Sequence, residues 1–95
     1  MASLNNIGSH KTSVFTENSI TKVCYHNTIV VSFDYNKIKL NTGGWFSNTT
    51  KTRMNQTSNQ FGLGFRVYQK NYDWYVEYNN KIYSFEQNQI EFKRS

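Results

Sequence analysis

The chain has 95 residues, enough for one domain with a single core, and this length excludes a two-domain enzyme. Hydrophobic residues make up 37% and aromatic residues 17% of the chain, which is typical of a folded protein with an aromatic core and not of a disordered one. Eleven Lys and Arg against six Asp and Glu give a formal net charge of +5, which favours an anionic partner, although the codon bias of an AT-rich genome would also raise the lysine content.

Cysteine content and hydropathy indicate the compartment. Cys24 is the only cysteine, so an intramolecular disulfide is impossible and a reducing compartment is the natural assignment. We expect neither a signal peptide nor a membrane span, because no apolar run has the necessary length. The chain is therefore expected to act inside a cell without a membrane partner.

The N-terminal part of the chain predicts an arm followed by strands. Residues 1–13 lack periodicity and are predicted to form a flexible arm, with residues 14–95 as a single domain. Three runs of β-branched and aromatic residues then predict strands at Ile20–Tyr25, Thr28–Phe33 and Lys37–Asn41.

Alternation within these runs predicts which side chains face the core. Ile29, Val31 and Phe33 are expected to share one face of the second strand. In the third strand Ile38 and Leu40 point one way and the two lysines point the other, as in a half-buried antiparallel strand.

Residues 42–60 break the alternation and predict a helix. Ser47 to Thr50 offer N-caps for a short helix of about ten residues, which runs through Asn59 or Gln60 and ends at Gly62. Its threonines are poor helix formers and Met54 and Phe61 alone mark an apolar edge, so packing and not propensity must hold it.

Alternation returns after the helix and completes the predicted fold. Further strands are expected at Phe65–Lys70, Trp74–Tyr78, Lys81–Phe85 and Ile90–Lys93. The predicted class is α+β, with a single antiparallel β-sheet of five to six strands and one short helix inserted, in the order β-β-α-β-β-β.

The distribution of charge points to an anion-binding region in the middle of the chain. No acidic residue lies between Asp34 and Asp73, and that stretch holds six basic residues: Lys37, Lys39, Lys51, Arg53, Arg66 and Lys70. Residues 1–34 are neutral, and residues 73–95 hold three basic against four acidic residues. Uniform codon bias would not divide charge in this way.

The glycine turn before the helix is the most concentrated constellation of candidate ligand-binding residues. Glycines allow a backbone to approach a ligand, and a helix start exposes N–H groups to an anion. The predicted phosphate-binding residues are Gly43, Gly44, Thr49, Thr50, Lys51 and Arg53. Their spacing is not that of a Walker loop, and the alternative is an ordinary strand-to-helix turn with a capped helix.

A second candidate site combines basic and aromatic residues. Alternation places Arg66, Tyr68 and Lys70 on one face, and a neighbouring strand can add Tyr75. Sheets that bind single-stranded nucleic acid stack aromatic rings on the bases and place cations beside the phosphates. Trp45 is a further candidate for base stacking. The alternative is that the helix or another subunit covers this face.

Catalytic and metal-binding chemistry has little support in the sequence. Cys24 and His26 share a strand face, but their side chains start roughly 7 Å apart, too far for a nucleophile and its base. His10 brings no further ligand at zinc spacing, and no pair of carboxylates has a diagnostic spacing. We therefore predict no cofactor, no metal and no enzymatic activity.

Three segments resemble a known family. LNTGGW (Leu40–Trp45), TTKTRMNQ (Thr49–Gln56) and GFRVYQKNYDWYV (Gly64–Val76) recur in this order in a family of small tailed-bacteriophage proteins, which the chain resembles from about residue 20 to residue 92. The resemblance implies expression in the cytoplasm of an infected bacterium. It also implies two phage tasks, which are handling nucleic acid and blocking host defence.

These observations lead to a ranked expectation of function. We expect a small non-catalytic phage-type protein that binds a phosphate-bearing ligand, first of all nucleic acid. The alternatives are an anti-defence protein that sequesters a nucleotide immune signal or inhibits a host defence protein, and a small nucleotide-cleaving enzyme. Seven Tyr, seven Phe and two Trp exceed what one sheet and one thin helix can enclose, so we also expect a homodimer or higher oligomer, formed through a sheet edge or the aromatic face.

Overall fold

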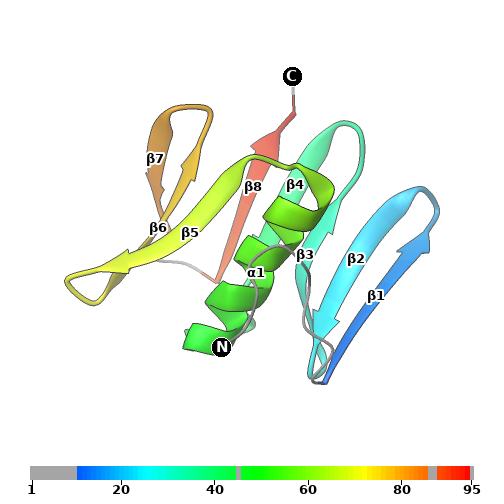
Figure 1. Ribbon diagram of the computed structural model, residues 1–95, viewed down its shortest axis with the longest axis horizontal. Helices are drawn as coiled ribbons and strands as arrows, with labels where there is room; N and C mark the ends of the chain where they lie inside the picture. The colour runs from blue at the N-terminus through cyan, green and yellow to red at the C-terminus, as the bar shows by residue number, and fades with distance from the viewer. Residues whose placement is uncertain (1–10, 45, 86–87, 95) are drawn as a thin grey trace.

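The computed structural model describes residues 11–44, 46–85 and 88–94 of the chain. These residues form eight strands and one helix: β1 (Thr12–Glu17), β2 (Ile20–Tyr25), β3 (Thr28–Phe33), β4 (Lys37–Asn41), α1 (Asn48–Phe61), β5 (Phe65–Lys70), β6 (Asp73–Tyr78), β7 (Lys81–Ser84) and β8 (Gln89–Lys93). The strands make a five-stranded antiparallel sheet in the order β1-β2-β3-β4-β8 and a three-stranded antiparallel sheet in the order β5-β6-β7. Helix α1 lies between β5 and the five-stranded sheet (Figure 1).

The α+β class is confirmed, but the predicted single sheet and element order are wrong. Most of the predicted strands lie where they were expected, and the bounds of β2, β3 and β4 match the prediction residue for residue. Two features make the observed topology differ from the predicted one. A further strand, β1, begins at Thr12, and β8 leaves the C-terminal meander to pair with β4. Of the predicted arm, residues 1–10 lie outside the described residues, and Thr12 and Ser13 belong to β1.

A β-bulge in β3 overturns one predicted face. Val23 pairs with Val31 while Cys24 pairs with Ile29, so Val30 is an extra residue in β3. The bulge brings Val30 and Val31 into the core together, at 1% and 0% exposure, and pairs Ile29 with the outward Cys24. The expectation that Ile29 shares a face with Val31 is therefore wrong, because strand alternation is interrupted between them.

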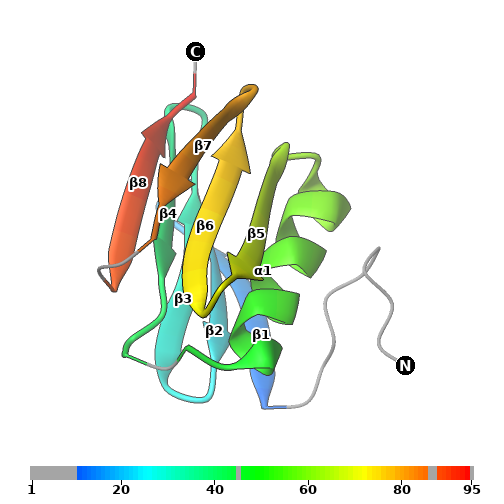
Figure 2. The same ribbon diagram turned by 90° about the vertical axis from the view of Figure 1, so that its left-hand side faces the viewer.

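One hydrophobic core joins the two sheets. Its members come from every strand except β1 and β7, with Met54 from α1 and two residues from connecting segments. Phe92 on β8 contacts Tyr78 on β6 and Tyr83 on β7, with ring centroids 5.0 and 4.9 Å apart. Because these rings come from both sheets, the Phe92 side chain of β8 packs the five-stranded sheet against the three-stranded one, as α1 does elsewhere (Figure 2).

Helix α1 ends at Gly62 as predicted and takes Ser47 from the four predicted N-cap candidates, but with 14 residues it is longer than the ten expected. The Ser47 side chain accepts a hydrogen bond from the backbone N–H of Thr50, and Gly62 ends the helix in the left-handed conformation at φ 64°. The helix lacks acidic residues in its first turn and buries six residues, of which Met54 alone is apolar. It is also too short and too polar to cross a bilayer.

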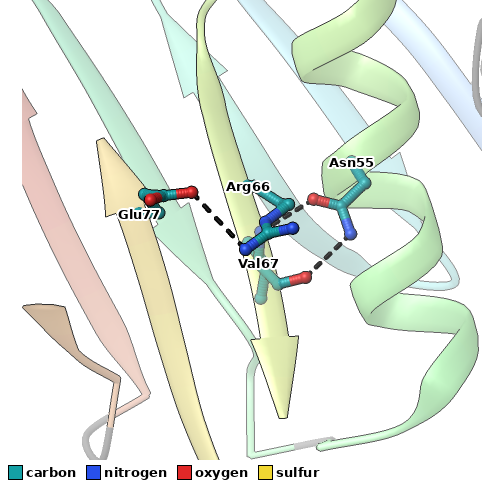
Figure 3. A network of polar contacts seen from close by, with 4 residues as sticks. All are labelled: Asn55, Arg66, Val67 and Glu77. Carbon is teal, nitrogen blue, oxygen red and sulfur yellow. Dashed lines mark hydrogen bonds and ion pairs between the residues drawn. The ribbon is translucent and has the colours of Figure 1, made fainter. Parts of the chain in front are cut away.

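Polar side chains attach α1 to β5. The Asn55 side chain donates to the carbonyl of Val67 at 2.9 Å and accepts from the N–H of Val67 at 2.8 Å, so one amide group pairs with both backbone groups (Figure 3). Ser58 does the same one turn later, since its hydroxyl donates to the Phe65 carbonyl at 2.7 Å and accepts from the Phe65 N–H at 3.0 Å. Two helix side chains therefore take the place of a neighbouring strand at this edge of the three-stranded sheet.

The turn between β3 and β4 depends on a carboxylate. Asp34 accepts hydrogen bonds from the backbone N–H groups of Asn36 at 2.7 Å and Lys37 at 2.9 Å, and these two bonds are the main causes that hold the pKa of Asp34 below its ordinary value of 3.8. Because the folded-state pKa is the lower one, this carboxylate stabilises the fold above about pH 3.8 and ceases to do so as the pH falls through the folded-state pKa.

We expect an NMR titration of the Asp34 carboxyl carbon to give a midpoint below 3.8, for this reason. The Asp34→Asn variant, which has no charge at this position, should lack the corresponding loss of stability in acid. A measured midpoint at or above 3.8 would contradict the assignment of the two backbone bonds.

Candidate nucleic-acid interface

The backbone amides of the glycine turn are already engaged. Gly43 and Gly44 have positive φ, at 64° and 89°, a conformation that glycine adopts without steric cost. The Gly43 N–H donates to the Asn41 side-chain oxygen at 2.9 Å, and the Gly44 N–H donates to the Thr42 hydroxyl at 3.1 Å. Asn41 at the end of β4 and the following Thr42 thus hold the turn with side-chain-to-backbone bonds. A phosphate would have to displace these bonds.

The predicted phosphate-binding residues on α1 do not converge. Thr50 is 1% exposed, with its hydroxyl 3.0 Å from that of Ser47. Lys51 extends to the ring of Trp74, with 5.6 Å from Nζ to the centroid, and Thr49 is half-buried. Trp45, the predicted stacking residue of this segment, lies outside the described residues.

Arg53 ties the helix to β1 and β2. Its side chain donates from Nε to the Thr12 hydroxyl at 2.9 Å and from Nη1 to the Gln56 side-chain oxygen at 3.0 Å. Its guanidinium also lies over the ring of Tyr25, 5.7 Å from the centroid, and the residue is 6% exposed. These contacts give Arg53 a structural role, which its position in a basic segment could not reveal.

A cavity of about 540 Å³ opens between the β2–β3 turn and the start of α1. Its lining residues are Tyr25, His26, Asn27, Thr28, Val30, Thr42, Ser47 and Thr50. None of them is acidic, and the helix start contributes the positive end of its dipole. Sequence reasoning missed this cavity because its walls come from three separate segments, and only Thr50 among its lining residues was a predicted ligand-binding residue.

The second predicted site is assembled in space. Arg66, Tyr68 and Lys70 of β5 lie on the outward face of the three-stranded sheet, and Tyr75 of β6 stands directly opposite Tyr68. We name this surface the tyrosine face and define it by the outward residues of the two strands: Arg66, Tyr68, Lys70, Asp73, Tyr75 and Glu77.

The two tyrosines of the tyrosine face form a stacked pair. The ring centroids of Tyr68 and Tyr75 are 5.6 Å apart with an interplanar angle of 27°, and both residues are half-buried. The guanidinium of Arg66 lies 5.0 Å from the centroid of the Tyr68 ring. Aromatic surface and a cation are thus side by side on a face that neither α1 nor the other sheet covers.

Antiparallel pairing redistributes the charge that is segregated along the sequence. Arg66 stands opposite Glu77, 3.5 Å away as an ion pair, and Lys70 stands opposite Asp73 (Figure 3 shows the first pair). On the other sheet Lys39 is likewise opposite Glu91. The six basic residues of the middle segment therefore lie on separate surfaces, several of them beside carboxylates, and form no single basic patch.

Metal and thiol chemistry gains no support within the described ranges. They contain no group of three His, Cys, Asp or Glu residues that could hold a metal ion. The thiol of Cys24 donates to the backbone carbonyl of His26 at 3.3 Å, which keeps it bonded within its own turn.

Comparison with known proteins identifies the family. The family described as "Kyanoviridae Gp96 protein" matches residues 1–94. The chain belongs to this family. It is thus a small bacteriophage protein, and the resemblance carried by the three sequence segments is confirmed at the level of a phage family. No curated protein and no solved structure matches this member of the Gp96 family.

Proposed function

We propose that the chain is a non-catalytic protein that binds single-stranded nucleic acid on the tyrosine face, inside the infected bacterial cell. The observation that carries the proposal is the stacked Tyr68–Tyr75 pair with Arg66 beside it on the outward face of the three-stranded sheet. Every base has an apolar ring face, so aromatic residues on a sheet hold single strands with little sequence preference.

The charges of the tyrosine face define how such a complex would form. The Arg66–Glu77 ion pair is solvent-exposed, with 66% and 44% of the two side chains accessible, and exposed pairs of this kind contribute only about 0–1 kcal/mol. Arg66 can therefore exchange Glu77 for a phosphate at small free-energy cost. Because Glu77 and Asp73 offset the two cations, stacking must supply most of the affinity and the salt dependence should be shallow.

The test is a titration of labelled single-stranded oligonucleotides at two salt concentrations. Tyr68→Ala and Tyr75→Ala should each weaken binding by about 5- to 150-fold, the equivalent of roughly 1–3 kcal/mol of stacking, whereas Tyr68→Phe should retain most of the affinity. Glu77→Gln should strengthen binding and steepen the salt slope by about 0.7, because it leaves Arg66 to a phosphate.

Tyr35 provides the matched control. It is 93% exposed in the turn between β3 and β4, away from the tyrosine face, so Tyr35→Ala should leave affinity unchanged. Absence of binding at low salt, or equal losses for Tyr35→Ala and Tyr75→Ala, would refute the proposal.

The cavity at the start of α1 favours a second candidate function, the sequestration of a nucleotide signal. Its volume is within the range of small-molecule sites, and Tyr25 offers an aromatic ring beside Ser47 and Thr50 at the helix start. The same set of variants separates the two candidates, because a nucleotide held in this cavity would bind equally well to Tyr68→Ala, Tyr75→Ala and the unchanged chain.

A further inference from the structure

The strand edges of this fold are protected unequally. Helix α1 covers the edge of β5 through Asn55 and Ser58, β7 has only four residues and begins with Lys81, and β8 carries Glu91 and Lys93. Short length, charge and coverage by a helix are the usual means by which edges avoid pairing with other chains. β1 has six residues and no strand beside it on its outer side among the described residues (Figure 1).

The composition of β1 offers little protection. It contains neither proline nor lysine, its single charged residue is Glu17 at its end, and its register with β2 has no bulge. Val14 and Phe15 are 43% and 40% exposed on its two faces. An extended, exposed strand of this kind is a template for pairing with another chain.

The hydrogen-bond pattern shows which β1 residues face the open edge. The Lys11 carbonyl accepts from the His26 N–H at 2.8 Å, so the Lys11–His26 pair is of the hydrogen-bonded type. Such pairs alternate along an antiparallel ladder, which makes Phe15–Lys22 another hydrogen-bonded pair. The N–H and C=O groups of Val14 and Thr16 therefore point away from β2.

We propose that β1 pairs with β1 of a second copy, so that two five-stranded sheets join into one continuous sheet around a two-fold axis. Such an axis keeps the core-side faces of both sheets on the same side of the joined sheet. Even-numbered residues of β1 must therefore pair with even-numbered residues of the second copy, and odd-numbered with odd-numbered. Placing Val14 opposite Val14 of the second copy meets this condition and aligns the outward N–H and C=O groups of both strands.

Charge favours this register over its neighbour. With Val14 on the axis, the register places Lys11 of one copy, the residue before β1, opposite Glu17 of the other, and the two-fold axis forms this contact twice. It adds to the ion pair that Glu17 makes with Lys22 of its own chain at 3.4 Å. A shift that places Phe15 on the axis would instead put Ser13 opposite Glu17. Hydrogen bonding and side-chain face are thus compatible with both registers, and charge selects the one with Val14 on the axis. The proposed dimer leaves the tyrosine face uncovered.

Light scattering over a range of concentrations tests the association. Because two six-residue strands bury less than the roughly 1,600 Å² of a standard interface, we expect a dissociation constant on the order of 10 μM. The mass should rise from 11.2 kDa towards twice that value, and Val14→Lys, which sets two lysines opposite each other, should abolish the rise. Ile82→Lys adds the same charge at a residue that is 61% exposed on the other sheet and should still dimerise.

Disulfide trapping tests the register, in a Cys24→Ser background that removes the only native thiol. In a hydrogen-bonded pair the Cα atoms are about 5.5 Å apart, within the range of disulfides, so Val14→Cys should cross-link under mild oxidation. Phe15→Cys should not, since its Cα atoms would be roughly 8 Å apart.

Three results would overturn the proposal. These are a mass that stays at 11.2 kDa up to about 300 μM, a folded Val14→Lys variant that still dimerises, and a dimer in which Phe15→Cys cross-links more readily than Val14→Cys. Far-UV circular dichroism of each variant confirms that the monomer remains folded. None of these results bears on nucleic-acid binding by the tyrosine face.

Discussion

Replacement of Asn55 by alanine should lower the free energy of unfolding by about 2–4 kcal/mol. The variant removes the side chain that bonds to both the N–H and the C=O of Val67, and Val67 is only 1% exposed. Each buried N–H or C=O group left without a partner destabilises the fold by about 1–3 kcal/mol, and water reaches this site poorly. Urea denaturation followed by tryptophan fluorescence measures the change.

Asn48 in the same helix provides the control. It is exposed at the first position of α1, so Asn48→Ala should change the free energy of unfolding by less than about 0.5 kcal/mol. Asn55→Asp gives a second comparison, because its carboxylate still accepts from the Val67 N–H but repels the Val67 carbonyl. Equal effects of Asn48→Ala and Asn55→Ala would show that the bond to β5 contributes nothing.

Gly43→Ala should lower the free energy of unfolding by about 2–4 kcal/mol. At φ 64° an added Cβ would lie 2.8 Å from both Cγ2 and Oγ1 of Thr28, too close for any real contact. The Thr28 side chain is short and β-branched, so it cannot move away without a change of rotamer or backbone. Thermal and chemical denaturation both report this loss.

The adjacent glycine separates the steric clash from backbone strain. Gly44 also has positive φ, at 89°, but nothing lies within 4 Å of the Cβ that alanine would add there. Gly44→Ala should therefore show the backbone contribution alone, about 1 kcal/mol. When Thr28→Ala is combined with Gly43→Ala, the double variant should recover much of the stability that the clash with Thr28 removes in Gly43→Ala. If the two glycine variants are equally destabilised, the contact with Thr28 is not the cause.

Local sequence patterns predicted the elements well. The caps of α1 followed from Ser47 and Gly62, because capping chemistry depends on residues within one turn. The outward positions of Arg66, Tyr68 and Tyr75 followed from the two-residue period of a strand, which the β5–β6 pair retains without a bulge. The tyrosine face could therefore be predicted before its geometry was known.

Long-range pairing could not be predicted in this way. Nothing in the alternation of Ile90–Lys93 indicates that β4, from the other half of the domain, is its partner. The charge pattern misled for the same reason at Lys39, since Glu91 is distant in sequence from the lysine that it opposes. Arg53 shows the limit most clearly, because a buried structural arginine and a phosphate-binding one look alike in a sequence.

The bonds from Asn55 and Ser58 to β5 also couple the motions of helix and sheet. The amide protons of Phe65 and Val67 are held by helix side chains, so they exchange with solvent only when α1 separates from β5. The helix in turn is rich in polar residues and has too little apolar surface to persist alone. The two elements therefore open and close as a single cooperative unit, and any event that loosens α1 exposes the unpaired edge of β5 at the same moment.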